Sequence, residues 1–295
     1  LVDPALLPSE LRQPLLASIE CLHYPQVRPR QAAAAAGTAT HEDGKQSHSS
    51  STDIVRARQR LSFEELLANH LSHRAVRAQL SSRRAPHLRG DGALQQRFVA
   101  ALPFSLTKAQ ERVTNEVLSD LSQPTPMYRL VQGDVGSGKT VVAALAAARA
   151  SEACQQTAVM APTELLAEQH MRQFSNWFEP LGVRMAWLGG RQTARARRDT
   201  LSALASGEAQ IAIGTHALFQ EAVRFARLGL VIIDEQHRFG VDQRHALLSK
   251  ASTSSADNAQ ASALVDYPHQ LIMTATPIPR TLQMTHFGHL DISSI

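Results

Sequence analysis

The chain has 295 residues, 43% of them hydrophobic, a formal net charge of +4 and a sequence pI of about 9.4. This length allows one domain with a substantial core plus roughly 100 further residues, and the charge mildly favours a polyanionic partner. The two isolated cysteines, Cys21 and Cys154, exclude a zinc cluster and a disulfide framework. No stretch reaches the roughly 18 uninterrupted apolar residues of a membrane span, so we expect a reduced, cytoplasmic setting and no membrane.

The first third of the chain divides into three predicted segments. Residues 1–25, with helical apolar spacing interrupted by prolines, resemble the tail of a larger helical region. Residues 26–52 combine an alanine run with small, polar and charged residues, which predicts a low-complexity, disordered insertion. Residues 53–101 form a predicted helical linker, which opens with one arginine-rich amphipathic helix over 53–84. The basic face of that helix fits two interpretations equally well, a contact with DNA or a solvated face.

Residues 102–295 alternate strand-like and helix-like segments, which predicts an α/β domain with a mainly parallel central sheet. The expected strands are Arg129–Gln132, Thr157–Met160, Gln210–Ile213, Leu230–Ile233 and Gln270–Met273. The expected helices between them include Thr140–Ala153, Glu164–Phe178 and Thr193–Ser206. Residues 251–266 are rich in Ser, Ala and Asn, which predicts a flexible loop insertion.

A complete phosphate-binding loop pattern, G-x-x-x-x-G-K-[ST], follows the first expected strand and precedes an expected helix. Its glycines let several backbone N–H groups point at phosphate oxygens, and the helix adds its positive dipole end. We therefore expect ATP and Mg²⁺ as cofactors, with Lys139 on the β- and γ-phosphates and Thr140 on the metal. The expected nucleotide-binding residues of the loop are Gly133, Asp134, Gly136, Ser137, Gly138, Lys139 and Thr140.

Two acids end a second apolar run, Leu230–Ile233. The run is rich in β-branched residues, which is typical of a strand buried on both faces. Nucleotide sites in parallel sheets lie beyond the carboxyl ends of the strands, so these acids and the phosphate loop are expected to converge. We expect Asp234 to hold Mg²⁺ directly or through water. We expect Glu235 to orient or deprotonate the attacking water, which makes Lys139, Asp234 and Glu235 the candidate catalytic residues.

Further candidate residues follow other expected strands. They are Pro162, Thr163 and Glu164, then Gly190, which follows only a short apolar run, then Gly214, Thr215 and His216, and finally Thr274, Ala275 and Thr276. A hydroxyl residue just before a helix is usually an N-cap, which is a structural explanation for Thr163. The same hydroxyl and N–H groups can also grip a DNA phosphate. Thr107 and Gln110 form a capping box, which is a sufficient structural reason for both residues, so the local pattern alone predicts no function for Gln110.

Taken together, these segments resemble the first motor domain of superfamily-2 DNA helicases, most closely the RecG family. The matching stretches are Leu102–Thr107 with Gln110, the phosphate loop, Met160–His170, Gly214–Leu218, Asp234–Val241 and Thr274–Thr281. The resemblance implies a RecA-like phosphate-loop NTPase fold for residues 102–295. It also implies that Gln110, Gln236 and His237 contact the nucleotide. DNA contacts are implied for Pro162–Glu164, Gly190 and Gly214–His216, and coupling of hydrolysis to movement for Thr274–Thr276.

What the resemblance implies as a whole is an ATP-dependent DNA helicase or translocase. It would act on branched double-stranded DNA, regressing stalled forks and migrating Holliday junctions in recombination and repair. The chain is expected to be the ATP-binding half, without the second RecA-like domain that normally supplies an arginine finger. Residues 1–25 and Leu61–Leu71 more loosely resemble the stretch that links a wedge domain to the motor. Residues 26–52 and 251–266 depart from the family pattern.

Two other functions remain open at this point. The chain could belong to a different superfamily-2 translocase, Mfd-like or PriA-like, since the acidic motif and the last motif are similar in Mfd. Gln236 stands where Mfd usually carries Glu, which favours the RecG family. The chain could also be a nucleotide-binding module without motor activity. The intact Glu235 argues against that alternative, because a protein that only binds ATP does not need a water-positioning acid.

Overall fold

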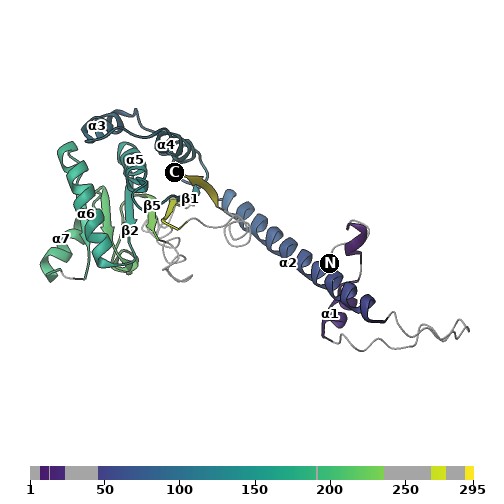
Figure 1. The fold of residues 1–295 in the computed structure, drawn as a ribbon. Helices are drawn as coiled ribbons and strands as arrows, with labels where there is room; N and C mark the ends of the chain where they lie inside the picture. The colour runs from purple at the N-terminus through teal and green to yellow at the C-terminus, as the bar shows by residue number, and fades with distance from the viewer. Residues whose placement is uncertain (1–6, 13, 24–45, 191, 236–266, 277–289) are drawn as a thin grey trace, which may run out of the picture. The chain divides into compact units, whose positions relative to one another are not determined.

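The computed structural model describes residues 7–12, 14–23, 46–190, 192–235, 267–276 and 290–295 of the chain. The chain divides into two compact units, Leu1–Arg74 and Ala75–Ile295. The boundary between the units falls inside the long helix α2 (Gln46–Ser81), which Figure 1 shows in blue. Within the described ranges, no helix is both long enough and apolar enough to cross a membrane.

The first unit is helical. It contains the 3-10 turn η2 (Ser9–Leu11), helix α1 (Leu15–His23) and the first part of α2. Helix α2 begins at Gln46, so residues 46–52 are helical and do not belong to a disordered insertion as predicted. A helix that has nucleated gains one backbone hydrogen bond for each residue added, so it can extend through polar residues that carry no apolar pattern. Residues 26–45 of that predicted insertion lie outside the described residues.

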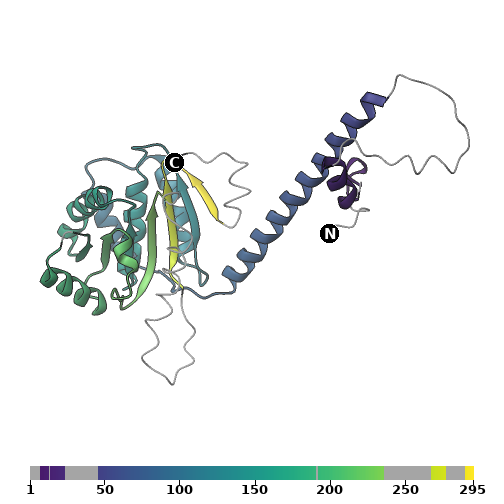
Figure 2. The same ribbon diagram turned by 90° about the horizontal axis from the view of Figure 1, so that it is seen from below.

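The second unit is built on a seven-stranded sheet (Figure 2). The strands are β1 (Tyr128–Gln132), β2 (Gln156–Met160), β3 (Met185–Leu188), β4 (Ile211–Gly214), β5 (Leu228–Asp234), β6 (His269–Thr274) and β7 (Asp291–Ser294). Their order in the sheet is β3-β4-β2-β5-β6-β1-β7, and every neighbouring pair is parallel. The predicted α/β fold with a mainly parallel central sheet is confirmed.

Helices cover both faces of this sheet. They are α3 (Ala93–Ala101), α4 (Lys108–Leu121), α5 (Lys139–Glu152), α6 (Glu164–Phe178) and α7 (Ala194–Ala205). Alternate residues of a strand point to opposite faces, so β5 serves two cores. Leu230 and Ile232 pack in the core beneath α5 and α6, whereas Val231 and Ile233 pack in the core that contains Leu204 of α7. Every residue of α5 from Val141 to Ala148 is buried.

Two strands were not predicted from the sequence. Strand β3 was expected only as a short apolar run, and β7 was not expected at all. Among the described strands, β7 lies at the edge of the sheet and pairs with β1 alone. Its four residues contain one apolar side chain, Ile292. An edge strand can be polar because it is not buried on both faces, so it leaves little pattern in a sequence.

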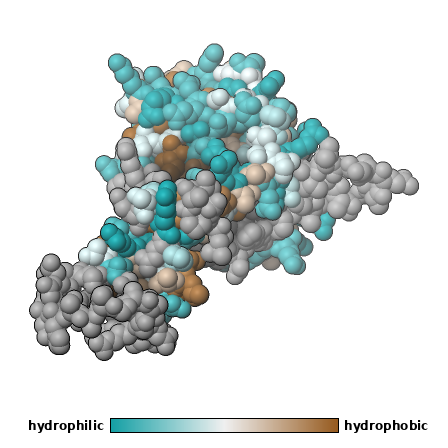
Figure 3. All heavy atoms as spheres, turned by 90° about the vertical axis from the view of Figure 1, so that its right-hand side faces the viewer, coloured by the Kyte–Doolittle hydropathy of each residue, from teal (hydrophilic) through white to brown (hydrophobic). Residues whose placement is uncertain are grey.

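Among the coloured residues on the face turned to the viewer in Figure 3, hydrophilic ones prevail, with smaller apolar areas between them. Large apolar side chains are nevertheless exposed in the second unit, including Phe104, Val135 and Leu165. Phe104 lies in the stretch Leu102–Thr107, Val135 in the phosphate loop and Leu165 in the first turn of α6, so all three lie in segments that match the helicase motifs.

Candidate functional site

All the described candidate residues, apart from Gln110, lie at or beside the carboxyl ends of the strands. Because the sheet is entirely parallel, these ends share one edge. The sheet order separates the candidates into two neighbouring groups. The phosphate loop, the acids and Thr274–Thr276 follow β1, β5 and β6, which are adjacent, whereas the expected DNA contacts follow β2, β4 and β3, which are also adjacent.

The phosphate loop connects β1 to α5 in the conformation that its glycines allow. Gly136 and Gly138 have φ angles of 82° and 89°, a left-handed region that other residues rarely adopt. The N–H of Gly133 donates to the carbonyl of Thr274 at 3.4 Å, which ties the loop to the end of β6. Among the described residues, no protein group hydrogen-bonds to the buried hydroxyl of Ser137. A turn of this shape with an open hydroxyl fits a phosphate group.

Lys139, the first residue of α5, turns back over the loop. Its Nζ donates to the carbonyl oxygens of Gly133 at 2.6 Å and Asp134 at 2.8 Å. Partial burial lowers the pKa of Lys139 below its usual range, and the negative charges of Asp234 and Glu235 oppose this shift. Gly133 of the loop bonds to Thr274, and Glu235 bonds to the next residue, Ala275, so the acids and the loop meet at the end of β6.

Gln110 contacts the phosphate loop as well as capping its own helix. Its Oε1 accepts from the N–H of Thr107 at 2.9 Å, which completes the predicted capping box at the start of α4. Its Nε2 donates to the carbonyl of Ser137 at 2.9 Å. The capping pattern explains the first contact but gives no signal for the second, because the second joins residues 27 positions apart. Gln110 therefore belongs to the site on structural grounds.

The two acids at the end of β5 point to different partners. Asp234 Oδ2 lies 2.8 Å from Nε2 of His170, a buried residue of α6. Glu235 has a φ of 52°, in the left-handed region, and its Oε1 accepts from the N–H of Ala275 at 2.9 Å. The Thr274 and Thr276 hydroxyls are 3.1 Å apart. The acidic pair thus contacts both the expected coupling segment and a helix that follows β2.

His170 is the residue that sequence reasoning missed. It ends the stretch Met160–His170, but no role was predicted for it. A histidine with helical spacing on an apolar stripe is typical of a core residue, and the partner here is 64 positions away. The only sequence signal is that the histidine interrupts the buried stripe of α6, which otherwise consists of Ala167, Phe174 and Phe178.

The expected DNA contacts form the second group at the same edge. Thr163 caps α6 by accepting from the N–H of Leu166 at 3.3 Å. Glu164 Oε1 accepts from the N–H of Gly190 at 2.5 Å, so the segments after β2 and β3 are joined directly. Gly214 has no room for a side chain, because a Cβ would lie 2.3 Å from the carbonyl oxygen of Leu188.

Other members of this group differ in exposure. Thr215 is buried, Pro162 is half-buried, and His216 is exposed and available to a partner. In the nucleotide group, Asp134 is exposed and Thr140 is half-buried in the first turn of α5. Gln236 and His237, which the family resemblance assigned to the nucleotide, lie outside the described residues.

Only two protein side chains, Thr140 and Asp234, are expected to bind Mg²⁺ at this site. Within the described part of the chain, no cluster of three or more His, Cys, Asp or Glu side chains could hold a metal ion. Mg²⁺ in nucleotide sites is held by one or two protein oxygens together with phosphate oxygens and water. The combination of Thr140 and Asp234 fits that donor set, whereas it would not suit a metal that needs an all-protein cage.

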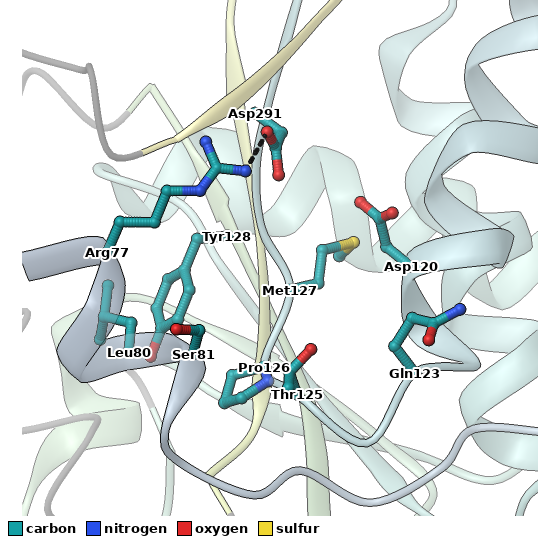
Figure 4. A pocket seen from close by; sticks show the side chains of 10 residues that line it. All are labelled: Arg77, Leu80, Ser81, Asp120, Gln123, Thr125, Pro126, Met127, Tyr128 and Asp291. Atoms are coloured by element: carbon teal, nitrogen blue, oxygen red, sulfur yellow. Dashed lines mark hydrogen bonds and ion pairs between the residues drawn. The ribbon is translucent and has the colours of Figure 1, made fainter. Parts of the chain in front are cut away.

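A cavity of about 140 Å³ lies elsewhere (Figure 4). Met127 and Tyr128 at the start of β1, and Asp291 at the start of β7, contribute to its wall. The ion pair between Arg77 and Asp291, 2.9 Å long, spans part of it. Because it lies at the amino ends of the strands, the cavity is separate from the edge that carries the candidate site.

Comparison with known proteins gives consistent results. A family model described as DEAD/DEAH box helicase matches residues 107–285. The ATP-dependent DNA helicase RecG of Escherichia coli O157:H7 is 55% identical over 81% of this chain and 33% of the relative. RecG of Aquifex aeolicus is 43% identical over 83% of this chain and 29% of the relative. The chain thus spans about a third of the length of the curated relatives it matches.

Solved structures show the same likeness. A structure of RecG bound to a three-way DNA junction superimposes with a TM-score of 0.69 at 39% identity, covering 82% of this chain and 30% of that one. The yeast DEAD-box splicing factor Prp28 superimposes with a TM-score of 0.51 at 16% identity, covering 68% of this chain and 48% of that one. The second match shows the shared fold alone, and supports the RecA-like helicase fold predicted from the sequence.

Proposed function

Because this chain belongs to the DEAD/DEAH box helicase family, we propose that it is the ATP-binding half of an ATP-dependent DNA helicase that acts on branched DNA. The observation that carries this proposal is the arrangement of one parallel-sheet edge. A phosphate loop, an Asp-Glu pair and a threonine segment occupy three adjacent strand ends, and the candidate DNA contacts occupy the three on the other side. The identity to RecG helicases, one of which is solved bound to a three-way DNA junction, supports branched DNA as the substrate. The proposed activity includes stalled-fork regression and Holliday junction migration in recombination and repair.

The nucleotide end of this edge supplies the groups that ATP hydrolysis needs. Backbone N–H groups of the loop and the Lys139 ammonium hold the phosphates. Thr140 and Asp234 would hold Mg²⁺, which when bound neutralises charge on the β- and γ-phosphate oxygens. Glu235 orients or deprotonates the attacking water. The Glu235 carboxylate also accepts from the N–H of Ala275. A displacement of Glu235 on loss of the γ-phosphate would therefore move Thr274–Thr276, the expected coupling segment.

The DNA end of the edge supplies groups for the phosphate backbone of a strand. The N-terminus of α6, with Thr163 and Glu164, and the exposed His216 after β4 lie on adjacent strand ends. Helix N-termini and hydroxyl groups bind nucleic-acid phosphates without reading the sequence. Contacts of this kind suit a protein that recognises a branched structure and not a particular base sequence.

The experiment that tests the proposal measures ATP hydrolysis by the complete protein with and without a forked DNA duplex. The control is Glu235→Gln, whose amide oxygen can still accept from Ala275 but cannot take a proton from water. We expect fork-stimulated turnover in the wild type and a loss of about 10²–10⁴-fold in the variant, with nucleotide binding retained. Nucleotide binding without stimulated turnover in the wild type would instead favour a nucleotide-binding module.

A further inference from the structure

Helix α6 physically joins the two groups of the candidate site. Its first residue, Glu164, accepts from the N–H of Gly190 at 2.5 Å in the candidate DNA group. Its seventh residue, His170, hydrogen-bonds to Asp234 of the nucleotide group at 2.8 Å. Six residues of α-helix correspond to about 9 Å along the axis. One short, rigid element therefore contacts the candidate DNA group at its N-terminus and the candidate metal-binding acid Asp234 near its middle.

The bond from His170 is not explained by helix packing. The other buried residues of α6 are Ala167, Phe174 and Phe178, and all are apolar. A polar group in such a stripe costs free energy unless it is hydrogen-bonded, so an apolar side chain would pack this helix more simply. The ring of His170 stands nearly perpendicular to that of Phe174, with an interplanar angle of 88° and centroids 6.5 Å apart. The ring is thus held in one orientation by packing and directed at one acceptor.

The bond also constrains Asp234. A carboxylate only accepts, so Nε2 of His170 carries the proton in this contact. The contact engages Oδ2 and restricts rotation of the carboxylate at the strand end. Hydrogen-bond partners of metal-binding side chains commonly set metal affinity in this way, and their loss typically costs 10- to 100-fold. A small displacement of α6 therefore changes how Asp234 presents its oxygens.

We propose that His170 is a positioning residue that couples DNA binding at the N-terminus of α6 to metal–nucleotide binding at Asp234. This inference rests on the proposed function, since it requires that DNA and nucleotide bind at the two groups described above. DNA that contacts Thr163 and Glu164 shifts α6, the His170 ring moves with its helix, and Asp234 follows through the hydrogen bond. By linkage, metal–nucleotide binding changes the affinity for DNA by the same factor.

The test measures that factor in the complete protein at equilibrium, without hydrolysis. The probes are a fluorescent, non-hydrolysable ATP analogue with Mg²⁺ and a forked DNA duplex. The dissociation constant of the analogue is measured without and with saturating fork, and the fork affinity without and with saturating analogue. We expect a wild-type coupling factor of at least about fivefold, the lower end of typical allosteric coupling.

Four variants separate the hydrogen bond from helix stability. His170→Ala removes the donor, and we expect its coupling factor to fall below about twofold and its Mg²⁺ affinity in the ternary complex to drop about tenfold. His170→Gln keeps an N–H donor four bonds from Cα, as in His Nε2, and is expected to restore most of the coupling. Phe178→Leu disturbs the same buried stripe without touching Asp234, and Gln173→Ala alters an exposed position of α6. Both should couple as the wild type does.

Each result decides between the proposals. Full coupling in His170→Ala would overturn the inference, as would equal loss in Phe178→Leu or in His170→Gln, because packing and not the hydrogen bond would then be responsible. Wild-type protein that binds both probes with a coupling factor of one would also overturn it and leave the proposed function intact. Wild-type protein that binds neither probe would refute the proposed function, and the inference would fall with it.

Discussion

Gly138 carries two separate constraints on its side chain. Its φ angle of 89° is in the left-handed region, and a Cβ there would lie 2.2 Å from Nε2 of Gln110. Gly136, in the same loop, has a φ of 82°, but a Cβ at that position would meet no atom within 4 Å. Both glycines therefore need a left-handed backbone, but only at Gly138 would a Cβ clash with Gln110. A comparison of alanine variants at the two positions separates the two effects.

We expect Gly136→Ala to cost about 1–2 kcal/mol of unfolding free energy, the strain of a left-handed alanine, and Gly138→Ala to cost more. The excess should come from the clash with Gln110, so it should shrink in the double variant Gln110→Ala, Gly138→Ala. Urea unfolding of the wild type, Gln110→Ala, Gly138→Ala and the double variant measures this as a double-mutant cycle, and Gly136→Ala is unfolded beside them. Equal costs at the two glycines would show that the Gln110 contact does not constrain the loop.

His269 is a buried histidine whose two ring nitrogens are both used. Nδ1 accepts from the N–H of Met127 at 3.0 Å, and Nε2 donates to the carbonyl of Pro86 at 2.8 Å. This arrangement requires the neutral ring, because a protonated Nδ1 would face another donor. Burial lowers the pKa of His269 to about 4, with a smaller contribution from the positive charge of His87, whereas its bond to Pro86 opposes the shift.

The depressed pKa predicts a specific loss of stability in mild acid. The unfolded state binds a proton near pH 6.5 and the folded state only near pH 4, so stability is complete above pH 6.5 and is lost as the pH falls towards 4. Between pH 7 and pH 5 we expect this residue to contribute a loss of about 2 kcal/mol. Urea unfolding at both pH values, in the wild type and in His269→Asn, measures it. An identical pH dependence in the two proteins would contradict the assignment.

The N-cap of helix α3 is Gly92, which has no side chain to cap the helix. Asp91 Oδ1 accepts from the N–H of Ala93 at 3.0 Å, and a carboxylate from the end of α5 accepts from the next two N–H groups. Glu152 Oε1 accepts from the N–H groups of Leu94 at 2.6 Å and Gln95 at 3.2 Å. Arg149 lies 3.5 Å from the other oxygen of Glu152. A negative charge at a helix N-terminus is favourable, so Glu152 both caps α3 and docks it on α5.

Removing this carboxylate should loosen one element selectively. We expect Glu152→Ala to cost about 1.5–3 kcal/mol, the range for hydrogen bonds to a charged group, and Glu152→Gln to cost less because an oxygen acceptor remains. Amide hydrogen exchange should accelerate most within α3. The control is Glu168→Ala, whose exposed contact with Arg172 at 3.8 Å should contribute less than about 1 kcal/mol. Similar losses at both glutamates would argue against the capping role.

The elements that the sequence predicts well are those whose signal is local. Helix α6 was predicted with the same ends as observed, Glu164 and Phe178, because Thr163 caps it and its apolar spacing is regular. Strand β7 and the bond between His170 and Asp234 were not predicted. Both depend on which distant segments become neighbours in the sheet, and a single sequence carries no local record of that. The same limit applies to the second role of Gln110.

At the scale of the whole molecule, one sheet edge carries both the candidate nucleotide group and the candidate DNA group on one unit. The family resemblance places ATP between two RecA-like domains, of which residues 102–295 represent the first. Among the described residues, Lys139 places its ammonium group over the phosphate loop, on the carbonyl oxygens of Gly133 and Asp134. None of the arginines in the sequence stands in a context that resembles the arginine-finger motif of the second domain. If the proposed function holds, we therefore expect a second positive charge to reach the γ-phosphate from another domain.

We accordingly expect the isolated 295-residue chain to bind ATP with Mg²⁺ weakly and to hydrolyse it about 10³–10⁵-fold more slowly than the complete protein, the usual contribution of an arginine finger. Binding comes from the loop and Lys139, so Lys139→Ala should abolish it in the isolated chain. Steady-state hydrolysis and titration with a fluorescent ATP analogue measure the two properties separately. Turnover in the isolated chain equal to that of the complete protein would show that the finger is not needed. Restored turnover on adding the second domain as a separate chain would show that the missing charge comes from there.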